Sequence, residues 1–166
     1  MRSGKLTNGA AIDTSPSFSP DGSRIVFESD RGGSPQIYRM PAQGGGAQRV
    51  TFSGNYNISP SPSPDGRWLS WVAPRDGVLN LWVAPLDKPE QARALTNERV
   101  RPIRSSFWSP DSKTLLFVND QGGGGYSEGG AFRILCEMNE QYTPARIRFY
   151  LMPGESFVYH AKSSWF

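Results

Sequence analysis

The chain has 166 residues, 37% of them hydrophobic, and a formal net charge of +3. This length and composition fit one domain with an ordinary core. Lys and Arg are scattered, so the charge pattern favours no nucleic-acid partner. The single cysteine, Cys136, excludes an intrachain disulfide and a cysteine-rich metal site. No apolar run approaches the ~18 residues of a membrane helix, and MRSGKLTNGAAIDTSPSF lacks the apolar core of a signal peptide. We therefore expect no membrane span.

The 18 glycines and 14 prolines indicate short elements joined by turns, and thus an all-β protein. An internal repeat supports this prediction. SPDG occurs at 19–22 and 63–66, and SPDS at 109–112, at intervals of 44 and 46 residues. This period is close to that of one propeller blade. We expect one domain, 1–166, with blade 1 at about 12–52, blade 2 at about 56–97, blade 3 at about 101–152 and a last strand at 156–162.

The predicted strands recur in the same order within each unit. KLTNG (5–9) opens the chain as the outer strand of a preceding blade or as a closure strand. Blade 1 then holds SRIVFES (23–29), QIYRM (36–40) and QRVTF (48–52), and blade 2 holds RWLSWVA (67–73), NLWVA (80–84) and RALTN (93–97). Glycine-bearing turns separate the second and third strands of each blade.

The third unit is less regular than the first two. KTLLFVN (113–119) is followed by AFRILCEM (131–138), ARIRFYLM (145–152) and SFVYHAK (156–162). AFRILCEM fits both helical and strand periodicity. We prefer a strand, because blade 3 still lacks its third and fourth strands.

The repeated motif is predicted to be a hairpin device. Proline presets φ near −65°, aspartate bonds back to nearby amides, and glycine or serine tolerates the conformation that follows. The turn-forming residues are Pro20, Asp21, Gly22, Pro64, Asp65, Gly66, Pro110 and Asp111. The alternative is a cluster of the three aspartates for metal or acid-base chemistry. We prefer the turn, because equivalent turns lie on separate blades, and we expect no metal and no cofactor.

One motif suggests an enzyme. Residues 125–129, GYSEG, match the G-x-S-x-G pattern of a serine-hydrolase elbow, and Ser127, Glu155 and His160 follow the chain order of a hydrolase triad. However, the elbow requires a buried strand immediately before it, and the apolar run 115–118 ends seven residues before Gly125. The 33 residues from Ser127 to His160 are also too few for βαβ crossovers of ~30 residues each. We therefore expect Ser127 to be a loop residue and the catalytic triad to be the alternative.

Aromatic and basic residues form two further candidate sets. Strand-position aromatics favour the core, with a sugar-binding or peptide-binding surface as the alternative; they are Trp68, Trp71, Trp82, Trp108, Trp165, Tyr38 and Phe27. The arginines of blade 1 are expected on its solvated faces, with binding of acidic partners as the alternative; they are Arg24, Arg31, Arg39 and Arg49.

The same stretches carry family resemblances. Residues 12–60, IDTSPSFSPDGSRIVFESDRGGSPQIYRMPAQGGGAQRVTFSGNYNISP, resemble the propeller repeats of the periplasmic TolB family. From about Pro64 to 123, the chain is more similar to the N-terminal propeller of prolyl oligopeptidase family serine peptidases. The change falls within SPSPSPDG (59–66), which suggests a composite chain, natural or engineered, joined where two blades share a turn.

These resemblances imply a non-enzymatic function. TolB propellers are binding platforms of the Tol-Pal envelope system, which implies a periplasmic location, and peptidase propellers gate a separate catalytic domain. About three blades make an incomplete propeller with open strand edges. We therefore expect a protein partner or self-association through open blade edges. The alternatives are the propeller part of a serine hydrolase, or an engineered chimera without selected binding.

Overall fold

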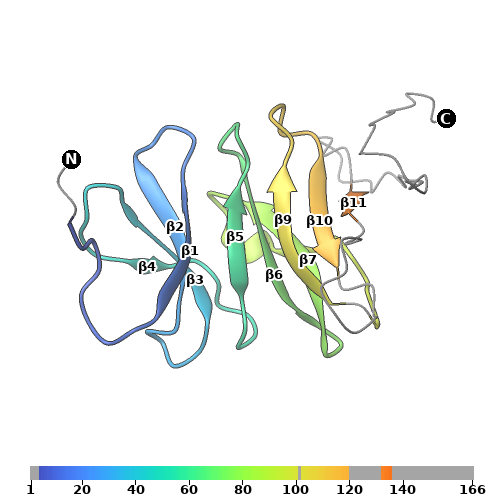
Figure 1. The fold of residues 1–166 in the computed structure, drawn as a ribbon, viewed down its shortest axis with the longest axis horizontal. Helices are drawn as coiled ribbons and strands as arrows, with labels where there is room; N and C mark the ends of the chain where they lie inside the picture. The colour runs from blue at the N-terminus through green and yellow to red at the C-terminus, as the bar shows by residue number, and fades with distance from the viewer. Residues whose placement is uncertain (1–3, 101, 120–131, 136–166) are drawn as a thin grey trace, which may run out of the picture.

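The computed structural model describes residues 4–100, 102–119 and 132–135, and its strands form three antiparallel sheets that stand side by side (Figure 1). Blade 1 has the order β1 (Asp13–Phe18), β2 (Arg24–Ser29), β3 (Gln36–Pro41) and β4 (Gln48–Arg49). Blade 2 has the order β5 (Ile58–Pro62), β6 (Trp68–Arg75), β7 (Val78–Pro85) and β8 (Arg93–Ala94). Blade 3 has β9 (Ile103–Trp108) beside β10 (Leu115–Asn119), which pairs with β11 (Phe132–Leu135).

The predicted fold class, an all-β chain of propeller-type blades, is confirmed. Two sheets have four strands, and the third has three within the described part of the chain. The helical content of these residues is the short 3-10 helix η1 (Pro89–Gln91) between β7 and β8. No helix among the residues that the structure describes is long and apolar enough to span a membrane. Phe132–Leu135 forms a strand against β10 rather than a helix.

The hydrophobic core lies between the faces of successive blades. Val26 and Ile37 of blade 1 pack with Leu69 and Trp71 of blade 2, and the opposite face of blade 2 packs on blade 3. Blade 2 is therefore covered on both faces, which explains why its central strands are almost continuously apolar. The first strands of successive blades contact one another, β1 with β5 and β5 with β9 (Figure 1).

The fourth strands are shorter than the sequence predicts. QRVTF and RALTN were expected to be strands of five residues, but β4 and β8 have two residues each. The reason is a threonine hydroxyl two residues beyond each strand. The Ile37 amide donates to Thr51 Oγ1 at 3.0 Å, and the Leu81 amide donates to Thr96 Oγ1 at 2.9 Å. A side chain thus satisfies an amide that a longer backbone ladder would use.

The prediction of a strand at 5–9 is wrong. Residues 4–12 contain no strand, and at the end of this segment the Ile12 amide donates to a side chain, Asp30 Oδ1, at 2.8 Å rather than to a backbone carbonyl. The predicted strands at 145–152 and 156–162 lie outside the described residues.

Gly77 provides a test of the hairpin geometry. Asp76 and Gly77 join β6 to β7 with φ of 52° and 81°, the two-residue turn that Asp-Gly favours. Gly77→Ala should lower the free energy of unfolding by about 1 kcal/mol, because alanine is strained at positive φ. Urea denaturation measures this loss. Gly46→Ala is the matched control, since that glycine has open space around it and no positive φ. Equal losses in both variants would contradict the turn assignment.

Candidate functional site

The first repeated turn is held by a serine and an aspartate. Ser19 Oγ donates to Asp21 Oδ1 at 2.5 Å, and accepts from the Arg24 amide at 2.9 Å. Asp21 Oδ1 also accepts from the Ser23 amide at 3.0 Å. Gly22 closes the turn with a φ of 68°. The same contacts recur at Ser63 and Asp65 and at Ser109 and Asp111, with Gly66 and Ser112 at the positive-φ position.

Successive turns contact one another, but their carboxylates do not come together in one cluster. The Asp65 amide donates to Ser112 Oγ at 2.9 Å, and a Cβ atom on Gly66 would lie 3.8 Å from Pro20 Cγ. Among the described residues, no group of three metal-ligating side chains comes together. Each aspartate serves its own turn, with Pro20, Pro64 and Pro110 exposed beside it.

The turn contacts lower the pKa of the aspartates. Hydroxyl groups of Ser19 and Ser23 hold the pKa of Asp21 at about 2, against an ordinary value of 3.8. Partial burial opposes ionisation of Asp65, but hydrogen bonds from Ser63 and Arg67 outweigh it, and the pKa of Asp65 is lowered. The Ser109 hydroxyl and the Lys113 amide lower the pKa of Asp111.

A lowered pKa in the folded state makes the stability depend on pH. The Asp21 contribution is present above pH 3.8 and is lost as the pH falls through about 2. Asp21→Asn should therefore be less stable than the wild type at neutral pH, and the difference should shrink between pH 4 and pH 2. Urea denaturation at a series of pH values measures this difference. Asp87→Asn, at an exposed aspartate, is the control. Parallel curves for wild type and Asp21→Asn would contradict the assignment.

A buried polar network ties the segment between blades 1 and 2 to both sheets. Gln36 Oε1 accepts from Thr51 Oγ1 at 2.8 Å and from Asn57 Nδ2 at 3.0 Å. Asn57 Oδ1 accepts from Trp71 Nε1 at 2.8 Å. All four side chains are buried. Gln36 Nε2 also donates to the Gly54 carbonyl at 3.2 Å, which fixes the path of this segment.

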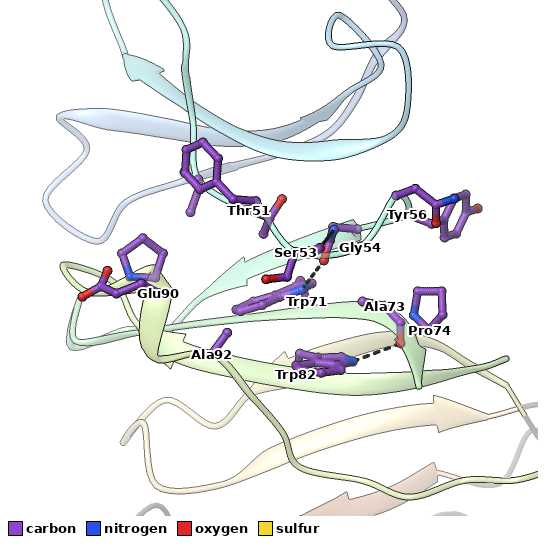
Figure 2. Close-up of a pocket in the computed structure, with 15 residues that line it drawn as sticks. Thr51, Ser53, Gly54, Tyr56, Trp71, Ala73, Pro74, Trp82, Glu90 and Ala92 are labelled. Carbon is purple, nitrogen blue, oxygen red and sulfur yellow. Dashed lines mark hydrogen bonds between the residues drawn. The ribbon is translucent and has the colours of Figure 1, made fainter. Parts of the chain in front are cut away.

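A cavity of about 310 Å³ opens beside this network (Figure 2). It is bounded by the linking segment 50–57, by the strands β6 and β7, and by the region of η1. Besides the linking segment, its lining residues are Trp71, Ala73, Pro74 and Trp82 of the strands and Pro89, Glu90 and Ala92 around η1. Both indole N–H groups have partners, Asn57 for Trp71 and the Ala73 carbonyl for Trp82 at 3.1 Å (Figure 2). The tryptophans therefore line the cavity as apolar rings.

The rim of the cavity has two exposed aromatic residues and one exposed acidic residue. Phe52 is 74% exposed and Tyr56 is 39% exposed, and both belong to the linking segment. Glu90 is exposed at the end of the cavity opposite Tyr56 (Figure 2). The lining contains no lysine or arginine. An exposed aromatic rim beside a preformed cavity is typical of a recognition surface.

The candidate residues of the sequence differ in whether the structure describes them and in how deeply they are buried. Ser127, Glu155, His160 and Trp165 lie outside the described residues. Phe27, Tyr38 and Trp71 are buried, and Trp68, Trp82 and Trp108 are half-buried. Arg24 is exposed. Arg31 and Arg49 lie over aromatic rings, and Arg39 is half-buried.

The cavity itself was not predicted from the sequence. Its rim residues Phe52 and Tyr56 lie in TFSGNYN, which looks like a loop, and Glu90 lies in a break of the strand pattern. The available signal was the pair of aromatic residues in an otherwise small and polar linking segment. Large apolar side chains in such a segment indicate either packing or recognition.

The comparisons with known proteins agree with this architecture. The family model of the TolB beta propeller domain (PD40) matches residues 2–125. The Tol-Pal system protein TolB of Desulfosudis oleivorans is 36% identical over 103 residues, or 60% of this chain. Dipeptidyl aminopeptidase BIII of Pseudoxanthomonas mexicana is 61% identical over 61 residues, or 37% of this chain. Both resemblances predicted from the sequence, to TolB repeats and to peptidase propellers, are thus found.

A solved structure supports the same fold. TolB from Acinetobacter baumannii superposes with a TM-score of 0.66 and 29% identity, covering 80% of this chain and 31% of that protein. The chain spans 23% of the Desulfosudis TolB and 9% of the aminopeptidase. On the match of the family model and on its blades, the chain belongs to the family of TolB beta propeller domains.

Proposed function

We propose that the chain is a non-enzymatic interaction module that binds a protein partner by taking one of its side chains into the cavity between blades 1 and 2. The observation that carries this proposal is the cavity itself, with its aromatic walls and exposed rim. Its volume of about 310 Å³ is at the small end of ligand sites, which suits one side chain rather than a whole cofactor. The similarity to TolB supports binding rather than catalysis.

A panel of capped tripeptides, acetyl-Gly-X-Gly-amide, tests this proposal. X is Phe, Leu, Arg, Glu or Ser, and two-dimensional NMR of the protein reports binding. We expect at least one peptide to shift the signals of Phe52, Trp82 and Glu90 in a saturable manner. Ala92→Phe should abolish the shifts, because a larger side chain fills the cavity. Ala10→Phe, at an exposed alanine, is the control. A folded protein whose cavity signals respond to no peptide contradicts the proposal and favours a chimera without selected binding.

The second candidate is the propeller part of a serine hydrolase, or such an enzyme in truncated form. The match to the dipeptidyl aminopeptidase favours it. The alternative triad of Ser127, Glu155 and His160 gives it a direct test. A fluorophosphonate probe that labels the wild type but not Ser127→Ala would overturn the non-enzymatic proposal. We expect no labelling that depends on Ser127.

A further inference from the structure

In blade 1, an arginine side chain of the chain itself packs on two aromatic rings and pairs with a carboxylate. Phe27 of β2 and Tyr38 of β3 lie opposite each other, and the guanidinium carbon of Arg31 lies 5.1 and 5.0 Å from the centroids of their rings. Asp13 completes this site, with its Oδ1 atom 2.9 Å from Arg31 Nη2. The chain thus binds one of its own cations between an aromatic pair and a carboxylate.

Blade 2 carries an aromatic pair at the corresponding positions. Trp71 of β6 and Trp82 of β7 also lie opposite each other, each the same number of residues beyond its counterpart in blade 1. The arginine that corresponds to Arg31 is Arg75, and its Nη1 atom donates to the Thr96 carbonyl at 3.1 Å. In blade 2 the place beside the aromatic pair is occupied by the cavity.

The charge around this cavity favours a cation. Glu90 is an acidic residue at the mouth, and the lining holds no basic side chain. Both tryptophans line the cavity, and Trp82 is the more accessible of the two, since it is half-buried whereas Trp71 is 3% exposed. Arg49 lies over Phe52, 5.4 Å from its centroid, so that ring already has a cation against it. Tryptophan is the aromatic residue that binds cations best.

We infer that the cavity takes the arginine side chain of a protein partner, with its guanidinium against Trp82 and paired with Glu90. This inference rests on the proposed function and adds the chemistry of the ligand. The matching site in blade 1 shows how such a group is held: an aromatic pair on one side and a carboxylate on the other. Arginine is preferred to lysine, because its planar guanidinium stacks on a ring while it hydrogen-bonds a carboxylate.

The decisive probes are acetyl-Gly-Arg-Gly-amide and its citrulline counterpart, which has nearly the same shape and no charge. Titrations followed by NMR measure both affinities. We expect the arginine peptide to bind about fivefold or more tightly, the effect of a cation–π contact of about 1 kcal/mol. Glu90→Gln and Trp82→Leu should each reduce this preference. Asp87→Asn, an exposed acid just before η1 and outside the lining, should leave it unchanged.

The outcomes separate the two proposals. Equal binding of the arginine and citrulline peptides overturns this inference but leaves the proposed function standing. No response of the cavity to any peptide overturns both. Because Trp82→Leu removes the hydrogen bond to the Ala73 carbonyl, circular dichroism checks its fold. If that variant is unfolded, Glu90→Gln decides alone: an unchanged preference for arginine in Glu90→Gln overturns the pairing.

Discussion

Leu81→Ala should lower the free energy of unfolding by about 3–5 kcal/mol, the upper part of the range for buried leucines. The Leu81 side chain is fully buried between blades 2 and 3, against Ile103, Leu115 and Phe117. These neighbours lie on extended strands whose backbones are fixed by their ladders, so they cannot easily close the space that the removed atoms leave. Urea denaturation followed by circular dichroism measures the loss.

Leu6→Ala is the matched control for this prediction. Leu6 is 43% exposed in the N-terminal segment, and its truncation should cost less than about 1 kcal/mol. A comparable loss in the two variants would contradict the placement of the core between the blades. A loss in Leu81→Ala below about 1 kcal/mol would mean that blades 2 and 3 pack loosely.

Asn57→Ala should cost about 2–4 kcal/mol, because it leaves the buried Trp71 Nε1 without an acceptor and removes two further hydrogen bonds. It removes the acceptor of Trp71 Nε1, a donor to Gln36 Oε1, and the donor to the Ser53 carbonyl at 3.0 Å. Each buried group left without a partner costs about 1–3 kcal/mol, and relaxation recovers part of the sum. Chemical denaturation measures the loss, and tryptophan fluorescence reports the changed surroundings of Trp71.

Asn55→Ala is the control, since Asn55 is exposed in the same segment. It should change the stability by less than about 0.5 kcal/mol. If Asn57→Ala were equally mild, the network would not hold the linking segment in solution. The cavity would then lack a fixed wall, and the proposed binding site would lose its physical basis.

The repeat made much of the fold predictable. The apolar runs around Phe27 and Trp71 form the second strands, and the recurring SPD element lies in the turns before them. These features are local: a turn depends on four or five consecutive residues, and a buried strand on its own apolar pattern. Sequence patterns therefore located both central strands of blades 1 and 2.

The cavity depends on interactions that no local pattern contains. Its walls come from the linking segment, from β6 and β7, and from the region of η1, and their spacing follows from how two sheets pack. The side-chain bonds that shorten β4 and β8 are equally non-local, since Thr51 bonds the amide of Ile37 on a different strand. Composition and periodicity predict that these residues belong to strands. They do not predict that a threonine hydroxyl takes the place of a backbone carbonyl as the acceptor for an amide.

The short outer strands restrict how this protein meets other chains. A partner that adds a β-strand needs a row of free amide and carbonyl groups along an edge. The outer strands of blades 1 and 2 have two residues each, and the threonine beyond each strand directs its hydroxyl inward. Such edges offer little template for strand addition, which also protects against edge-to-edge aggregation. Strand addition is therefore unfavourable at β4 and β8, the outer edges of these two blades.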